Sequence, residues 1–106
     1  LPEGYELAAG ETIPNTLSDK TEVRVIKVVP AVITNTFRYM DGDKQVGQDV
    51  VAWGPANAYL STANYKKLST LPEGYELAAG ETIPNTLSDK TEVRVITVKK
   101  KIYLIK

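Results

Sequence analysis

The side chains of this sequence that are capable of chemistry are carboxylates, hydroxyls and lysines, because the chain has neither histidine nor cysteine. General acid–base catalysis near neutral pH and first-row metal binding therefore lack their commonest side chain. Disulfides, thiolate nucleophiles and cysteine metal sites are excluded as well. Ser61 and Ser69 have no histidine to activate them. We therefore expect a protein that is not an enzyme, with no catalytic residue and no cofactor.

Two groups of carboxylates have the residue types for acid–base or metal chemistry. Glu73, Glu76 and Glu81 offer the paired carboxylates that glycoside hydrolysis needs, but each adjoins a turn or a strand edge, and solvated surface charge is the better interpretation. Asp41-Gly42-Asp43 offers alternate carboxylates to calcium but lacks the later oxygen ligands of an EF-hand. Asp-Gly is also typical of a tight type I′ turn, so we expect a turn here and no metal site.

Aromatic side chains are the other candidates for ligand contact, because tyrosine and tryptophan suit sugar rings and protein hot spots alike. In a domain this small, Trp53 and Tyr75 are predicted to belong to the core. Loops on a rigid scaffold often carry binding residues. The ligand-binding residues predicted here are therefore those of the irregular segment 55–70, namely Tyr59, Tyr65, Asn57 and Asn64.

Alternating apolar residues predict the elements that position these side chains. Residues 31–40 are expected to form a strand, with Ile33, Phe37 and Tyr39 on one face. After the Asp-Gly turn, residues 44–53 are expected to return as a second strand with a bulge at Gly47. A short helix over 63–68, capped by Ser61 or Thr62, should follow.

The next segment contributes two more predicted strands, 75–79 and 91–98, joined by a polar loop over 80–90. Val93 and Val95 share one face of the later strand, and the apolar register shifts at Ile96, which indicates a bulge or burial on both sides. Residues 102–105 are expected either to form a last strand or to replace 29–33. The order of elements predicts an α+β or all-β module with a four-stranded mixed sheet.

The chain contains an internal repeat, because residues 1–26 are identical to residues 71–96, at an offset of 70. Independent segments do not converge on the same loop residues, so the identity reports copying. We interpret 1–28 as the second half of a preceding repeat with two strands, 29–98 as one complete module, and 99–106 as a tail or the start of the next repeat. Neighbouring repeats are then natural partners.

Identity also means that 1–26 can occupy the site of 71–96, in the same molecule or in another. We therefore hypothesise either a strand-exchanged homodimer or a second hairpin that extends the sheet.

Charge and hydropathy argue against two classes of partner, nucleic acid and the membrane interior. Thirteen basic residues balance thirteen acidic ones, so no net field favours nucleic acid. The run at 99–101 is explained by a solvated lysine tail. No apolar run approaches the length of a membrane span, and we expect no membrane insertion.

The segment FRYMDGDKQVGQDVVAWG, followed by LPEGYELAAGE and TEVRVITV, resembles MucBP-type mucin-binding repeats of Gram-positive surface adhesins. The residues that carry the resemblance are Tyr39, Asp41, Gly42, Gly74, Tyr75, Leu77, Val93 and Val95. LPEGY has an additional Glu between Pro and Gly, and the Trp53-Gly54-Pro55 stretch is not typical of those repeats. The resemblance implies a β-rich, ubiquitin-like β-grasp fold with a mixed sheet and at most one short helix. It also implies a secreted, cell-wall-attached parent protein that contacts a host glycoprotein or glycan.

Three functions follow from these observations. An adhesin repeat would bind mucin, another glycoprotein or a glycan weakly per module and tightly through many copies. A structural spacer would lengthen a stalk without a ligand of its own. An engineered partial repeat would carry the same identity without a natural function.

Overall fold

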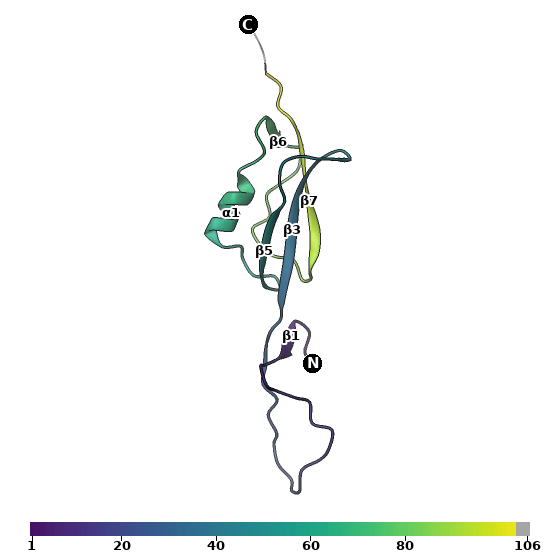
Figure 1. Cartoon of the computed structure of the whole chain (residues 1–106). Coiled ribbons are helices and arrows are strands. Elements are labelled where there is room, and N and C mark those ends of the chain that lie inside the picture. Colours follow the sequence, from purple (N-terminus) through teal and green to yellow (C-terminus); the bar gives the residue numbers. More distant parts are fainter. Residues whose placement is uncertain (104–106) are drawn as a thin grey trace.

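The computed structural model describes residues 1–103. They form an elongated molecule with principal extents of 85 × 26 × 22 Å (Figure 1). Residues 1–31, which precede β3, make a narrow part at one end, and the last described residues extend from the other end. A mixed sheet and a helix make up the thicker part between them. The last strand predicted at 102–105, as one of two alternatives, lies partly outside the described residues, and Ile102 and Tyr103 are not in a strand.

The thicker part is built from strands β3 to β7 and one helix among the described residues. Their bounds are β3 Val32–Asp41, β4 Lys44–Gln45, β5 Val50–Pro55, α1 Thr62–Ser69, β6 Tyr75–Leu77 and β7 Glu92–Lys100. The sheet order is β4-β3-β7-β6, with β5 also paired to β3. β3 and β7 run parallel, from Asn35 opposite Glu92 to Met40 opposite Thr97, and the other pairs are antiparallel. The predicted α+β class with a mixed sheet and one short helix is confirmed.

The first hairpin has a different turn from the one predicted. Asp41 pairs with Lys44, so Gly42 and Asp43 form the two-residue loop. Gly42 has φ +62°, whereas Asp43 is not among the residues with positive φ. A type I′ turn needs positive φ at both positions, and a type II′ turn needs it only at the first. The hairpin is therefore confirmed, and the type I′ assignment is wrong.

The predicted returning strand over 44–53 is interrupted. Gly47 has φ +68°, and residues 46–49 leave the sheet between β4 and β5, although Val46 stays buried. Both pieces lie along the same edge of β3. Five strands are therefore found in this sheet where four were expected.

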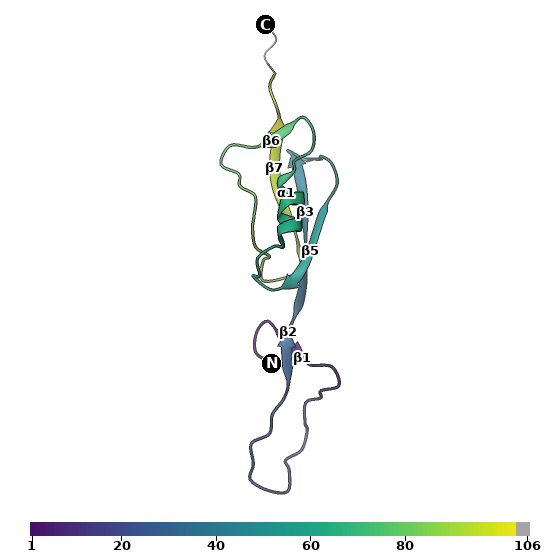
Figure 2. The same cartoon turned by 90° about the vertical axis from the view of Figure 1, so that its left-hand side faces the viewer.

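Helix α1 packs on one face of the sheet (Figure 2). Ser61 caps it as predicted, because its Oγ accepts a hydrogen bond from the Asn64 backbone N–H at 3.1 Å. That bond satisfies one of the free N–H groups of the first turn. Leu68 points into the core, which is completed by strand residues and one loop leucine: Phe37, Tyr39, Val46, Val50, Ala52, Leu87, Ile96 and Val98.

The opposite face of the sheet is open, and this corrects two predictions. Trp53 is 69% exposed rather than buried, because alternation puts it on the face opposite Val50 and Ala52. Strand β7 pairs with β3 without a bulge. Ile96 is buried and Val95 is 55% exposed, so one face of β7 is covered and the other is not. Tyr75 is half-buried and packs against the core.

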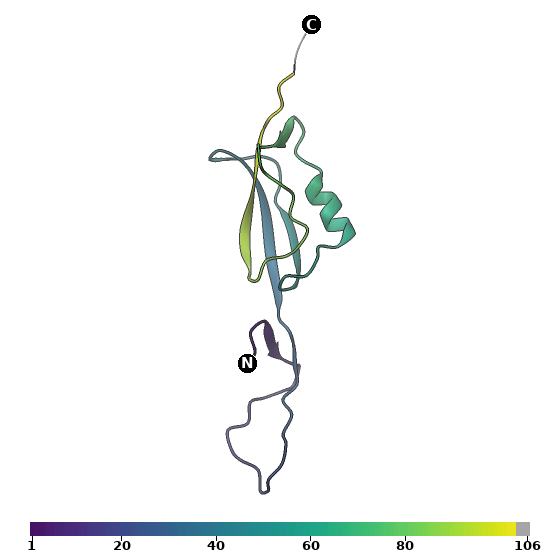
Figure 3. The same ribbon diagram turned by 180° about the vertical axis from the view of Figure 1, so that it is seen from behind.

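The narrow part (Figure 3) contains β1 Tyr5–Leu7 and β2 Val28–Pro30, which form a separate two-stranded sheet and are labelled in Figure 2. Tyr5 pairs with Pro30 and Leu7 with Val28, the same register as Tyr75 with Lys100 and Leu77 with Val98. The expected repetition is therefore right for this hairpin. It is wrong for residues 22–27, which are not in a strand although their counterparts form most of β7. Nor does the hairpin extend the larger sheet.

Candidate functional site

Tyr59 and Tyr65 line one shallow groove. The segment after β5 is held against the polar loop by two backbone bonds, from Leu60 N to Asn85 O and from Leu87 N to Ala58 O, both 2.8 Å. This fixes the backbone of Tyr59 while its side chain stays 80% exposed. Helix α1 presents Tyr65, which is 40% exposed. The groove encloses about 320 Å³, and its lining residues are Tyr59, Leu60, Thr62, Tyr65 and Asn85.

The two predicted asparagines lie elsewhere. Asn57 has φ +64° and donates its backbone N–H to Ser88 O at 3.0 Å. It lines a groove of about 550 Å³ at the junction with the narrow part, together with Tyr5 and Pro30. Asn64 lies in the first turn of α1, where its backbone bonds to the cap. The structure therefore brings together the two predicted tyrosines and adds Asn85, which the sequence did not single out.

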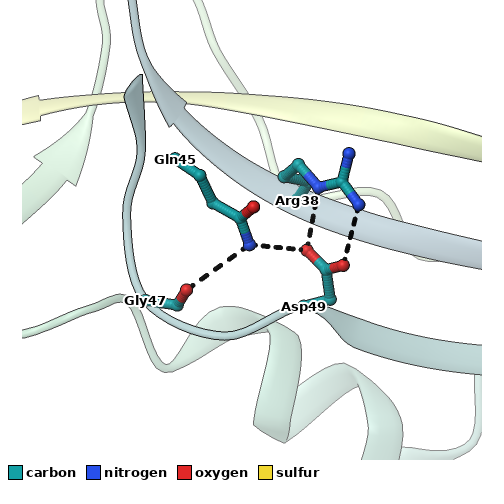
Figure 4. A network of polar contacts seen from close by, with 4 residues as sticks. All are labelled: Arg38, Gln45, Gly47 and Asp49. Atoms are coloured by element: carbon teal, nitrogen blue, oxygen red, sulfur yellow. Dashed lines mark hydrogen bonds and ion pairs between the residues drawn. The ribbon is translucent and has the colours of Figure 1, made fainter. Parts of the chain in front are cut away.

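A larger groove of about 740 Å³ lies between α1 and residues 47–50. Beside it Arg38 donates to Asp49 through two bonds, Nε to Oδ1 at 3.0 Å and Nη2 to Oδ2 at 2.9 Å (Figure 4). Gln45 Nε2 donates to the same Oδ1 at 2.9 Å. The hydrogen bond from Arg38 lowers the pKa of Asp49. This carboxylate is thus held ionised by partners that fasten the 46–49 segment to β3, which makes it a poor proton acceptor.

Glu81 is not the solvated surface charge that was predicted. Its Oε2 accepts from the Thr97 backbone N–H at 2.9 Å, and its Oε1 accepts from the Thr82 N–H at 3.1 Å. These backbone bonds, that from Thr97 foremost, lower the pKa of Glu81. Glu76 lies 3.7 Å from Lys99 in an ion pair on the surface. Glu73 is exposed. Glu73 and Glu76 are thus surface charges, as predicted, whereas Glu81 has a structural contact with β7.

The open face of the sheet is the feature that the sequence analysis missed. Thr34 pairs with Trp53, and Thr36 lies between Val51 and Val93. Val51, Trp53, Val93 and Val95 are 44–69% exposed, and with the part-buried Thr34 and Thr36 they form an uncovered strip across β5, β3 and β7. The alternation of β5 already separated Val51 and Trp53 from the buried residues of that strand. The prediction of a buried Trp53 rested on the small size of the domain, and the alternation along β5 is the sequence signal that points to its exposure.

Within residues 1–103, no three carboxylates come together in a way that would hold a metal ion. The buried side-chain nitrogen and oxygen atoms of this part all have hydrogen-bond partners. No described helix has the length and apolar character needed to cross a membrane. Comparison with protein-family models, with curated proteins and with solved structures finds no match to this chain. The site therefore has to be interpreted from its geometry alone.

Proposed function

We propose that this chain is a tandem-repeat unit of a non-enzymatic, extended surface protein, in which each repeat adds a rigid segment to a shaft. The observation that carries the proposal is the junction between the two parts. β2 ends at Pro30, and β3 begins at Val32, so one residue, Ala31, separates them. The Ala31 N–H also donates to Gly4 O at 2.9 Å. A junction this short and hydrogen-bonded resists bending, unlike a flexible linker.

The strand register gives the length of one repeat. Glu92 pairs with Asn35, so the two residues lie at the same level. Glu22 is the counterpart of Glu92 and precedes Asn35 by 13 residues. At about 3.3 Å per extended residue, each repeat advances the shaft by about 43 Å.

Small-angle scattering of arrays with one, two and three repeat periods tests this proposal. We expect the maximum dimension to grow by about 43 Å with each added period, because extended strands set the spacing. A flexible string of beads would instead grow with roughly the square root of the repeat number. Growth of that kind would refute the shaft.

The wider assignment rests on the resemblance to MucBP-type repeats, which suggests attachment to the cell wall of a Gram-positive bacterium and exposure outside the cell. The fold supports a β-grasp assignment in one respect. The hairpin of β3 with β4 and β5 is followed by helix α1. Strand β7 then lies parallel to β3 and beside it in the sheet.

A second candidate function is binding of a host glycan or glycoprotein in the Tyr59–Tyr65 groove. Two exposed tyrosines and the amide of Asn85 line it together, which is the combination of ring faces and polar groups that sugar recognition uses. Repetition would raise a weak affinity by effective concentration.

Binding of multi-repeat arrays to immobilised mucin tests this candidate. Tyr59→Ala and Tyr65→Ala should each lower the retained fraction several-fold. Tyr103→Ala is the matched control, because Tyr103 is a 70% exposed tyrosine that does not line the groove. Equal retention of all four proteins would exclude this groove as the site.

A further inference from the structure

The two identical segments differ in what covers their apolar side chains. Leu87 is 3% exposed and Ile96 is 1% exposed, because β3, β5 and α1 pack over them. Their counterparts Leu17 and Ile26 are 96% and 39% exposed. The sequence is the same in both places, so the difference comes from the covering elements. Residues 1–28 therefore carry an apolar face whose natural cover has the structure of residues 29–70.

The polar contacts of this cover are equally specific. Asn35 is fully buried on β3. Its Nδ2 donates to Ser88 Oγ and to Lys90 O, both at 3.0 Å. Its Oδ1 accepts from the Ser88 backbone N–H at 2.8 Å and from Arg94 Nη1 at 3.1 Å. Asn35 thus joins β3 to Ser88 and Lys90 of the polar loop and to Arg94 of β7.

The matching groups in the first copy already have the required arrangement. Arg24 Nη1 donates to Thr16 O at 2.9 Å, as Arg94 does to Thr86 O at 2.8 Å. Ser18 Oγ donates to Lys20 O at 2.9 Å, as Ser88 does to Lys90 O at the same distance. The receiving groups for an incoming asparagine are therefore preorganised, which lowers the entropy lost on binding.

The β3 strand of the same molecule cannot supply this asparagine. Residues 22–27 would have to lie parallel to β3, as β7 does, and only residues 28–31 connect the two segments. A parallel pair needs a crossover of a dozen or more residues. A strand-exchanged dimer cannot cover residues 1–28 either. Each molecule has two receiving halves, residues 1–28 and 71–98, but one covering unit, residues 29–70. Every exchange leaves as many halves uncovered as it covers.

We propose that residues 1–28 are a docking surface for a second unit with the structure of residues 29–70, supplied by the adjoining repeat of the same polypeptide. This inference rests on the proposed repeat array and names the contact that would hold it together. The join is sterically simple, because Thr70 is followed directly by Leu71, the counterpart of Leu1. The incoming asparagine binds Ser18, Lys20 and Arg24, and Leu17 enters the core of the completed module.

Thiol labelling can test this docking, because the chain has no cysteine of its own. A single Leu17→Cys substitution is made in the full chain and in an extended chain that carries residues 29–70 directly before Leu1. Leu87→Cys in the full chain provides the rate of the covered position. We expect Cys at 17 to react about as fast as a free thiol in the full chain. In the extended chain it should react at least about 100-fold more slowly, approaching the rate at 87.

Two further variants make the result specific. Phe37→Asp in the added unit alone should restore fast labelling at 17, because it removes the core of the covering unit. Asn35→Ala in the added unit should raise the rate by at least about tenfold over the intact extension. Labelling at 17 that stays fast in the extended chain would overturn the proposal. So would protection of the unextended chain that grows with protein concentration, since a second molecule would then be the cover.

The outcome is independent of the shaft test. Slow labelling in an array that scatters as a compact particle would support the docking surface and refute the shaft. Fast labelling in an array that lengthens by about 43 Å per repeat would support the shaft and refute the docking surface.

Discussion

The hydroxyl of Tyr39 donates a hydrogen bond to the carbonyl oxygen of Leu68. Tyr39 lies on the central strand β3, and Leu68 lies in the last turn of α1, so this bond fastens the helix to the middle of the sheet. The carbonyls of a last helical turn have no partner within the helix. Burial also raises the pKa of Tyr39, so the phenol remains a proton donor throughout the neutral range.

Replacement of Tyr39 by phenylalanine should therefore destabilise the module by about 1–2 kcal/mol, because the Leu68 carbonyl loses its partner while the ring stays in place. Urea unfolding measures the change. Tyr59→Phe is the matched control, since the Tyr59 side chain is 80% exposed, and its stability should stay near that of the parent. Equal stability of the two variants would contradict the role given to this bond.

Removal of the Asn35 amide should be costlier. Asn35→Ala leaves Ser88, Lys90 and Arg94 without their common partner, and we expect a loss of about 2–3 kcal/mol in the free energy of unfolding. Asn35→Asp keeps the acceptor but not the donor, so it should lie between alanine and the parent. An exposed asparagine, Asn15, provides the control substitution to alanine.

The two copies offer a comparison in which the local sequence is held constant. Leu87→Ala should destabilise the module by about 2–4 kcal/mol, as is typical of a buried leucine. Leu17→Ala should change the free energy of unfolding by less than about 0.5 kcal/mol, as is typical of surface positions. Denaturant titration of both variants measures the difference. Similar losses would mean that Leu17 is covered in solution by something outside this chain's own fold.

Acidic pH should weaken the attachment of the polar loop to β7. The pKa of Glu81 is lowered in the folded protein, chiefly by the Thr97 N–H, from a usual value of 4.5. Its contribution to stability is therefore present above about that pH and is lost as the pH falls through the folded pKa. The stability difference between the parent and Glu81→Gln should shrink as the pH falls below 4.5. Glu73→Gln, at an exposed position, is the matched control substitution.

Gly47 should tolerate substitution less well than Gly42. Both have positive φ, at +68° and +62°, so alanine is strained by roughly 1–2 kcal/mol at either position. A Cβ on Gly47 would also lie 3.0 Å from Pro72 Cγ, whereas one on Gly42 would meet nothing within 4 Å. Gly47→Ala should therefore lower the melting temperature more than Gly42→Ala. The opposite order would mean that the contact with Pro72 does not decide the cost of the substitution.

Several features could be predicted from the sequence because short-range interactions decide them. The Ser61 cap depends on the next three residues, and the hairpin at Gly42 depends on a glycine that accepts positive φ. The exact turn type was missed, and the irregularity predicted at Gly47 as a bulge is a full break over 46–49, because both depend on how β4 and β5 share one edge of β3. The exposure of Trp53 follows from strand alternation, but only once it is known that a single face of the sheet is covered.

The identical segments separate the two kinds of information. By itself, the repeated sequence determines the short strands Tyr5–Leu7 and Tyr75–Leu77, the loop bonds of Arg24 and Arg94, and the carboxylates Glu11 and Glu81, each of which accepts from the backbone N–H sixteen residues later in the chain. Only the tertiary structure decides that residues 92–97 become a buried strand while 22–27 do not. The physical reason is that strand pairing and burial need β3 and α1, and a chain with two receiving halves and one covering unit can complete only one of them.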